Sequence, residues 1–573
     1  MDMHKVLCWM LALLLLGGCA TTQVTTTDPE QAAAIALLEE GKPEQAAPRL
    51  EALAALATGP QRSALLADAA YAWLAAGDSN RARQLAAQVD PRRLPAASKV
   101  RQALVKAHLS LAEDQPASAL AALDLPFATV PPTHYVDWYL TRARALEATG
   151  NLIPAAAERA AAHPLLKGEA RVDNQRNIDR LLSGLDDQTL AARAAALPVG
   201  DPLYNFAGRA LQRRGLPLPR PFDRGNQWLA NTANRPPADR DGFRPPVKLA
   251  VLLPLSGELA TAAAPVRDGL LAGYYGEQRR RPDISFFDTK GTPAGALDAY
   301  AKAVAANADF VVGPLGRDEV TALFRESTLS VPMLALNRGA LPPPDGSAGF
   351  SLTPEDDGLI GAEYLYSRER RHVVVIAGND DNGRRAATAF REGFNERGGT
   401  VVETLNVGDT PGDLSAKLSA AARSGADSVF LALRGNTARA VAPQLALAGL
   451  GDKSRVATSQ LTAGTGKPEQ DSALDGIVFP TERWGAYSIP GLPPPTTLGE
   501  RLPTARGPAA RLFAFGHDAW LLTAFLEKLA LDANSELPGA TGILRLDGFG
   551  NVVRQPGWST FSAGRPTPLT GVP

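Results

Sequence analysis

The sequence contains almost no cysteine, no long hydrophobic run and no excess of charge of one sign. Its 573 residues include two cysteines, Cys8 and Cys19, which both lie within the first twenty positions. The rest of the chain therefore holds no disulfide and no cysteine-ligated zinc or iron–sulfur cluster. The formal net charge of -1 provides no basic field that would attract DNA or RNA, so nucleic-acid binding is disfavoured.

Catalytic motifs are also lacking. The nucleophile elbow G-x-S-x-G, the zinc-binding H-E-x-x-H and the phosphate-binding G-x-x-x-x-G-K-[ST] do not occur, and the six histidines are scattered. One neighbouring pair, His517 and Asp518 in GHDAW, suggests general-base chemistry. Adjacent helical residues point about 100° apart, so we interpret His517 as a packing residue. The sequence predicts no enzyme activity, no metal and no cofactor.

The first residues are typical of a signal peptide. An apolar run from Val6 to Leu16 follows Lys5, and eleven helical residues span about 16 Å, too little for a bilayer core of about 30 Å. Leu16-Gly17-Gly18-Cys19 then resembles the bacterial lipobox. This resemblance implies cleavage after residue 18 and covalent diacylglycerol and N-acyl groups, such as palmitate, on Cys19.

The residue after the lipobox bears on localisation. Ala20, rather than Asp, resembles Gram-negative lipoproteins that are exported to the periplasmic face of the outer membrane. The alternative is an ordinary signal peptide with an incidental cysteine. We predict a signal peptide over 1–18 and a lipid anchor with a polar tether over 19–29.

Residues 30–215 are rich in Ala, Leu, Arg and Glu, and a repeat of helical pairs is predicted there. Gly41, Gly77, Glu113 and Gly150 recur at intervals of 36, 36 and 37 residues. A small residue follows each of them after five positions: Ala46, Ala82, Ser118 and Ala155. The interval is close to the 34 residues of a tetratricopeptide repeat, so we predict a tetratricopeptide-like solenoid in which Gly ends each first helix. A non-repetitive helical bundle is the alternative.

A Pro-rich linker is predicted over 216–246, and the composition then changes at Val247. From 247 to 573, short apolar strands such as VKLAVLLPL, HVVVIAG and DSVFLAL alternate with helical segments. This alternation predicts parallel sheets covered by helices, in two lobes that divide near residue 350. The fold class is therefore α plus α/β, multidomain. The terminal run TGILRLDGFGNVVRQPGW predicts two strands joined by a Gly-rich turn.

Several runs in this half resemble type 1 periplasmic binding proteins, whose two lobes close on a ligand at a hinge: LPLSG, VVGPLGRDEV and TGILRLDGFGNVVR. The resemblance implies that the turns after the strands line a cleft. The cleft residues expected from this resemblance are Ser256, Gly257, Gly313, Pro314, Leu315, Asn337, Arg338, Asp380, Arg434 and Gly435. Ordinary βα turns without a ligand are the alternative reading of these positions.

The order lipobox, helical repeats and bilobed domain, together with VRDGLLAGYY, FAFGHDAW and the terminal run, resembles the LpoA family of penicillin-binding protein activators. The resemblance implies an outer-membrane lipoprotein that binds a class A penicillin-binding protein, a bifunctional peptidoglycan synthase, and stimulates its transpeptidase. It thereby implies a regulator of cell-wall synthesis and cell shape. The alternative is a solute-binding lipoprotein that captures an amino acid, a peptide or a wall fragment. A Pro-rich stretch at 488–503 departs from the family pattern, and we predict a loop there.

Overall fold

The computed structural model of the protein describes residues 29–223, 235–325, 329–532 and 534–569. The predicted signal peptide, both cysteines and nearly all of the tether lie outside the described residues. By its contacts the chain divides into two compact units, Met1–Asn174 and Gln175–Pro573. Each unit is described by itself.

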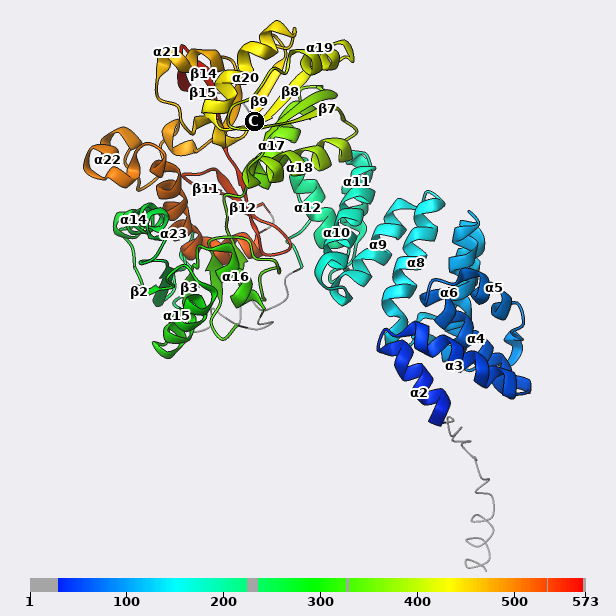
Figure 1. The fold of residues 1–573 in the computed structure, drawn as a ribbon. Helices are drawn as coiled ribbons and strands as arrows, with labels where there is room; N and C mark the ends of the chain where they lie inside the picture. Colours follow the sequence, from blue (N-terminus) through cyan, green and yellow to red (C-terminus); the bar gives the residue numbers. More distant parts are fainter. Residues whose placement is uncertain (1–28, 224–234, 326–328, 533, 570–573) are drawn as a thin grey trace, which may run out of the picture. The chain divides into compact units, whose positions relative to one another are not determined.

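The first unit consists of helices joined by short turns, as the sequence predicts (Figure 1). Its cores are built largely from alanine and leucine, so neighbouring helices pack closely. The helices are α2 (Pro29–Glu39), α3 (Pro43–Leu56), α4 (Gly59–Ala75), α5 (Ser79–Ala86), α6 (Ala96–Ala112), α7 (Pro116–Ala122), α8 (Tyr135–Ala148) and α9 (Leu152–Ala162).

The predicted helix ends are confirmed in three of the four units of the repeat. Gly41, Gly77 and Gly150 follow α2, α4 and α8 with φ of +74°, +89° and +79°, the left-handed conformation that glycine adopts at little cost. In the remaining unit the prediction is wrong by one residue. Glu113 is the C-cap of α6, and the left-handed residue is Asp114, with φ of +56°. Aspartate tolerates this region better than glutamate because its short side chain can hydrogen-bond locally.

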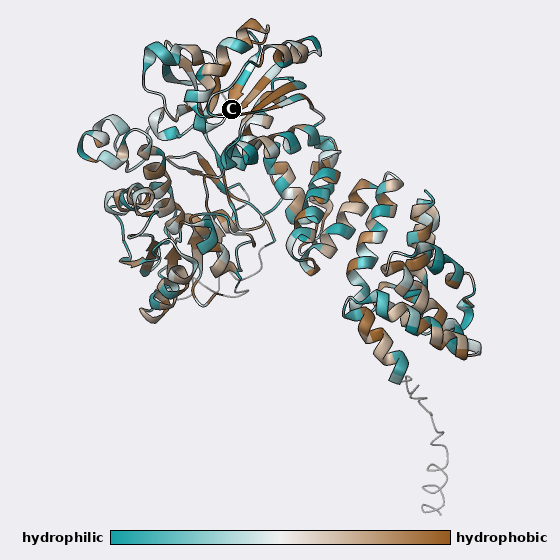
Figure 2. Ribbon diagram, viewed as in Figure 1, coloured by the Kyte–Doolittle hydropathy of each residue, from teal (hydrophilic) through white to brown (hydrophobic). Residues whose placement is uncertain are grey.

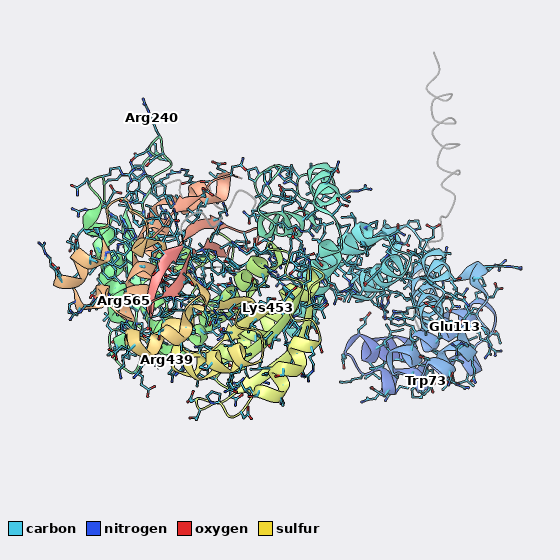
Figure 3. All side chains as sticks on the ribbon, turned by 90° about the horizontal axis from the view of Figure 1, so that it is seen from above. Trp73, Glu113, Arg240, Arg439, Lys453 and Arg565 are labelled. Carbon is cyan, nitrogen blue, oxygen red and sulfur yellow. The ribbon has the colours of Figure 1, made fainter. Side chains whose placement is uncertain are left out.

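The buried small residues show the same one-residue shift. Ala46, Ala82 and Ala155 are fully buried where the paired helices meet. Ser118 is exposed, however, and the buried position in its unit is Ala119, five residues after Asp114. Glu113 lies on the surface, where its carboxylate accepts a hydrogen bond from Arg83 at 2.8 Å (Figure 3).

A buried polar network connects helices of the first unit. Arg101 on α6 donates from Nη1 to Asp68 Oδ1 at 3.0 Å and from Nε to His134 Nε2 at 3.1 Å. His134 therefore accepts with Nε2 and is uncharged there. Burial, assisted by Arg101, lowers the pKa of His134 to about 4.

The second unit begins with helices rather than with the α/β domain. Helix α10 (Gly168–Ser183) crosses the division, and α11 (Asp187–Ala196) and α12 (Tyr204–Arg213) follow it. The expected helical domain 30–215 is thus helical throughout, but its last part groups with the α/β domain. The physical reason is the packing of α12 on a turn of that domain, which is described below.

The first lobe of the α/β domain holds a parallel five-stranded sheet in the order β2-β1-β3-β4-β5. Its helices are α14 (Ala260–Gly276), α15 (Pro293–Ala305), α16 (Arg317–Phe324) and the long α23 (Ala509–Leu531). The strands are β1 (Lys248–Leu253), β2 (Asp283–Asp288), β3 (Phe310–Val312), β4 (Met333–Ala335) and β5 (Ala348–Gly349). A small antiparallel sheet of β11 (Leu537–Pro538), β12 (Ile543–Leu546) and β13 (Val552–Gln555) shares its core.

The second lobe holds a seven-stranded sheet in the order β15-β14-β10-β9-β8-β6-β7. The strands are β6 (His372–Gly378), β7 (Thr400–Val407), β8 (Ser428–Ala432), β9 (Ser454–Ala457), β10 (Val478–Thr481), β14 (Gly557–Ser562) and β15 (Arg565–Leu569). The helices are α17 (Pro354–Tyr366), α18 (Asp381–Glu396), α19 (Ser415–Arg423), α20 (Gly435–Leu447) and α21 (Pro468–Asp471). The central strands β6 and β8 are apolar and buried along nearly their whole length, as predicted for strands that are covered by helices (Figure 2).

This arrangement is the bilobed type 1 periplasmic-binding-protein fold that the sequence predicts. Strands β9, β14 and β15 were not foreseen. The last two form an antiparallel hairpin at the edge of the sheet, and β15 carries Pro566 and Pro568. Proline at alternate positions hides an edge strand from a search for apolar runs.

The two Pro-rich segments are packed against the domain rather than free. In the described part of the predicted linker, Phe243 is fully buried in the first lobe and Arg244 pairs with Glu527 at 2.9 Å. Residues 224–234 lie outside the described residues. The stretch 488–503, predicted as a loop, contains the short helix α22 (Pro495–Arg501), and Trp484 Nε1 donates to Pro493 O at 2.8 Å beneath it.

Candidate functional site

The turn after β1 already binds a carboxylate of the chain itself. Ser256 Oγ donates to Asp288 Oδ2 at 2.6 Å, and the backbone N–H groups of Leu255, Ser256 and Lys290 donate to Oδ1 at 2.9, 3.3 and 2.8 Å. These bonds, the one from Ser256 foremost, lower the pKa of Asp288. The groups that would bind an anionic ligand at this turn are therefore occupied by Asp288. This occupation disfavours the solute-binding alternative.

The glycines among the expected cleft residues are explained by close backbone approaches. Gly257 has φ of +82°, and a Cβ there would lie 3.0 Å from the carbonyl oxygen of Lys290. At Gly313 a Cβ would lie 1.9 Å from Leu252 O, and at Gly435 it would lie 2.3 Å from Leu461 O. Glycine at these positions serves the packing of βα turns.

Other expected residues also make contacts within the domain. Leu315, which follows Pro314, accepts with its carbonyl from Asn337 Nδ2 at 2.8 Å. Arg338 extends from the first lobe and donates from Nη2 to Asp356 Oδ1, on α17 of the second lobe, at 2.8 Å. The nearby Asp356 carboxylate raises the pKa of Arg338.

In the second lobe, two of the expected residues lie side by side at a pocket. Asp380 caps α18 by accepting from Gly383 N at 2.8 Å, and its Oδ2 lies 3.7 Å from Nε of Arg434. The pocket holds about 80 Å³. The residues around it are Leu352, Pro354, Asp357, Asp380, Asn382, Gly383, Ala386, Ala432, Leu433, Arg434, Thr458, Ser459, Gln460 and Arg511. The expected residues of the first lobe do not belong to this lining, so the structure does not bring the ten positions together.

Sequence reasoning missed the charged residues at the base of the pocket, above all Asp357 and Arg511. Asp357 is 2% exposed and its Oδ2 accepts from Ser459 N at 3.0 Å and from the Ser459 hydroxyl. Arg511 Nη1 donates to the same hydroxyl. One signal was available, because three consecutive acids, Glu355, Asp356 and Asp357, begin α17 directly after Pro354. Nothing local in the sequence marks Arg511.

Each member of this acidic triplet has a different arginine near it. Glu355 accepts two hydrogen bonds of 2.8 Å from Arg385 on α18, within the second lobe. Asp356 pairs with Arg338 of the first lobe, as described above. Asp357 lies 4.0 Å from Nη2 of Arg511 and 3.8 Å from Nη2 of Arg554. The first turn of α17 is therefore a junction of the two lobes.

The His517–Asp518 pair is a structural element, as predicted. The two side chains are buried, and His517 Nδ1 lies 3.5 Å from Asp518 Oδ1. Both carboxylate oxygens of Asp518 bind the loop before β12. They accept from Ala540 N at 2.6 Å, from Thr541 N at 2.7 Å and from Thr541 Oγ1 at 2.6 Å. Asp518 thus anchors this loop and is not placed to orient His517 for catalysis.

The runs VRDGLLAGYY and FAFGHDAW meet where α14 crosses α23. A Cβ on Gly269 would lie 1.9 Å from Phe513 O, and a Cβ on Gly516 would lie 1.9 Å from Val266 O. The two helix backbones are therefore in direct contact at this crossing. The glycines that gave these runs their recognisable pattern are required by that contact.

The third run, TGILRLDGFGNVVR, forms the β12–β13 hairpin. The turn of this hairpin contacts α12. Asn205 Nδ2 donates to Gly548 O at 3.0 Å, and the Phe206 and Phe549 rings lie 4.7 Å apart. The Arg209 guanidinium lies 4.4 Å from the Phe549 ring and pairs with Asp179 at 2.8 Å. This turn therefore joins α12, the helix that precedes the α/β domain, to that domain.

In the described ranges, no group of three or more His, Cys, Asp or Glu residues could hold a metal ion. Within the same ranges, no helix has the length and apolar character needed to cross a bilayer.

Comparison with known proteins identifies a matching family and several similar proteins. A family model described as LppC putative lipoprotein matches residues 50–196 and 243–564. The chain is similar to proteins named penicillin-binding protein activator LpoA. The one from Photobacterium profundum is 24% identical over 525 residues, covering 81% of this chain and 82% of that protein. The one from Vibrio vulnificus is 24% identical over 351 residues, covering 56% of this chain and 58% of that protein.

A solved structure shares the fold over most of the chain. Full-length LpoA from Haemophilus influenzae, in a monoclinic crystal form, has a TM-score of 0.51 and 19% sequence identity. The match covers 95% of this chain and 98% of that one. The similarity supports the order of a helical part followed by a bilobed α/β domain.

Proposed function

The chain belongs to the LppC putative lipoprotein family, and from that premise we propose that it binds and activates a class A penicillin-binding protein. The observation that carries the proposal is the match, over 81% of the chain, to a protein named a penicillin-binding protein activator. The partner would be a bifunctional peptidoglycan synthase, and the effect a faster transpeptidation. The protein acts in this proposal as a regulator and not as an enzyme.

The mechanism that suits this architecture is allosteric. An activator of this kind contributes no reacting group; it binds one state of the synthase more tightly and so increases the population of that state. The α/β domain is the proposed binding element, because the family's recognisable runs build its first lobe and its joint to α12. The helical unit serves as the spacer from the membrane.

We further propose that Cys19 carries the lipid and that the anchor lies in the periplasmic face of the outer membrane. The support is the lipobox pattern and the lipoprotein family, together with Ala20 after the modified cysteine. Several acyl chains at about 0.8 kcal/mol per buried CH₂ give a stable anchor without a spanning helix.

The activator proposal is tested with the soluble chain that begins after Cys19 and a purified class A synthase in detergent. We expect the two proteins to bind and the fraction of cross-linked peptides to increase relative to synthase alone. The Gly412→Ala variant, altered at an open loop position, serves as a matched control that should activate equally. Absence of both binding and any change in cross-linking would refute the proposal.

The anchor is tested separately in cells. Replacing Cys19 by Ala should abolish labelling with radioactive palmitate and prevent processing of the precursor. Replacing Ala20 by Asp should leave the lipid in place but move the protein to inner-membrane fractions on a density gradient. Labelling that persists in the Cys19 variant would contradict the lipid assignment without affecting the activator proposal.

A further inference from the structure

The segment between β10 and α23 covers part of the first lobe. Residues 483–507, which we call the Pro-rich cap, enclose a small core with buried side chains from Trp484, Ile489, Leu492 and Ala505. This core continues into Phe513 at the start of α23. The cap is also held by Thr504 Oγ1, which donates to Asp268 Oδ2 on α14 at 2.8 Å. The Pro-rich cap is therefore a fixed part of the first lobe, with α22 at the outside of the domain (Figure 1).

The Pro-rich cap and the end of α14 form one surface. A Cβ on Gly276, the last residue of α14, would lie 2.7 Å from the carbonyl oxygen of Gly491 in the cap. Tyr275, directly before this contact, is 65% exposed, and Tyr487 of the cap is 39% exposed. Burying such large rings against a partner is favourable, because their apolar area leaves water while the hydroxyl group keeps a polar contact.

Four arginines of this surface have no carboxylate of the chain to pair with. They are Arg281, which follows α14, and Arg483, Arg501 and Arg506 of the Pro-rich cap. None of the four makes an ion pair within the described residues. Two of them lie over tyrosine rings instead. The guanidinium carbon of Arg281 lies 5.8 Å from the centre of the Tyr275 ring, and that of Arg483 lies 4.6 Å from the centre of the Tyr487 ring.

Neighbouring arginines are paired, so these four are an exception on this side of the lobe. Arg279, in the same run of three arginines after α14, pairs with Glu277 at 2.9 Å. Arg267 on α14 pairs with Asp268 at 2.9 Å. The Pro-rich cap contains one acid, Glu500. Four arginines and one glutamate leave a formal surplus of +3 on this surface, in a chain whose net charge is -1.

We propose that this surface is where the chain binds the synthase, through an acidic segment of that protein. The proposal rests on the activator function proposed above and adds the binding surface and the charge of the partner's segment. Tyrosine and arginine are enriched where protein interfaces derive most of their affinity. Arginine also binds carboxylates through paired, charge-assisted hydrogen bonds. The arginines attract the acidic segment and pair with it, while the tyrosines form the contact that holds the complex together.

Binding kinetics separate these two contributions. The association and dissociation rates of the soluble chain that begins after Cys19 are measured on an immobilised class A synthase, at low and at high salt. The Arg281→Glu/Arg501→Glu/Arg506→Glu variant should associate about tenfold more slowly, or more, at low salt, because reversed charges repel the acidic segment. Its difference from the parent chain should shrink at high salt, which screens exposed charges. Tyr275→Ala should instead dissociate about tenfold faster at a nearly unchanged association rate.

A matched control reverses three other exposed cations. Arg423, Lys453 and Arg565 are exposed in the second lobe, and the last two are labelled in Figure 3. Arg423→Glu/Lys453→Glu/Arg565→Glu changes the net charge by the same amount and should keep the association rate of the parent chain. The side chains replaced in all three variants are exposed, and thermal unfolding of each variant checks that it is folded.

The outcomes distinguish this proposal from the activator function. A parent chain that binds the synthase, with both rates unchanged in the triple arginine variant and in Tyr275→Ala, would overturn the surface and leave the activator function intact. An equal slowing in the second-lobe control would also overturn it, because net charge alone would then explain the effect. A parent chain that binds no class A synthase would overturn both proposals.

Discussion

The contact between α14 and α23 offers the sharpest test of the fold. Replacing Gly516 by Ala places a Cβ 1.9 Å from Val266 O, whereas even a tight contact requires about 3.0 Å. The neighbouring atom belongs to helix backbone and not to a flexible side chain. The two helices therefore have to separate by about 1.1 Å, the difference between these distances.

The cost of this separation follows from two opposing effects. Overpacking a well-filled contact destabilises by about 1–3 kcal/mol, and a backbone–backbone contact belongs at the upper end because neither partner can rotate away. Against this loss, alanine in a helix interior stabilises the helix by about 1 kcal/mol relative to glycine. We expect a net loss of about 2 kcal/mol in the free energy of unfolding of the second unit, which corresponds to a fall of a few degrees in its melting temperature.

Calorimetry of the soluble chain would measure this loss, with Gly412→Ala as the control. A Cβ at Gly412 meets nothing within 4 Å, so that variant should be neutral or slightly stabilised. The transition of the first unit should be unchanged in both variants. Equal stability of Gly516→Ala and Gly412→Ala would show that the helices do not approach as closely as described.

Three further predictions concern buried polar groups. The pKa of His134 is lowered from 6.5 to about 4, so the folded first unit favours the uncharged side chain. The contribution that the uncharged, buried His134 makes to stability is therefore fully present above pH 6.5. That contribution, about 3 kcal/mol, is lost as the pH falls toward 4, so urea unfolding at pH 7 and 4.5 should differ less in His134→Gln than in the parent. Asp518→Ala leaves buried N–H groups such as that of Thr541 unpaired and should cost about 3 kcal/mol or more, seen in thermal unfolding; a smaller loss in Asp518→Asn is expected. Arg209→Ala removes the guanidinium over Phe549 and should accelerate amide exchange in α12 while leaving exchange in β1 unchanged.

Much of the fold could be predicted because its rules are local. Apolar β-branched runs alternate with helical segments, and this pattern alone specifies parallel sheets with covering helices. The helix ends at Gly41, Gly77 and Gly150 were predictable because a left-handed residue selects glycine. The one-residue error at Asp114 arose where a second residue type tolerates the same backbone conformation. The prolines of β15 concealed an edge strand for a related reason, since they suppress the usual strand pattern.

The site was less predictable because its residues come from distant parts of the chain. Asp380 and Arg434 line the pocket, and each follows a strand of the same sheet. Arg511 and Arg554 meet Asp357 only through the way three segments cross between the lobes, which no local pattern encodes. The expected anion site at Ser256 was chemically reasonable, but Asp288, some thirty residues away, supplies the anion from within the chain.

Pro566 and Pro568 on β15 also bear on how the edge of the large sheet meets other molecules. The strand keeps its register with β14 through all five residues, so the two missing N–H groups lie on its outer side. A strand from a neighbouring molecule would find no donors at these positions and could not extend the sheet there. These two prolines therefore disfavour the addition of a further strand at this edge of the large sheet.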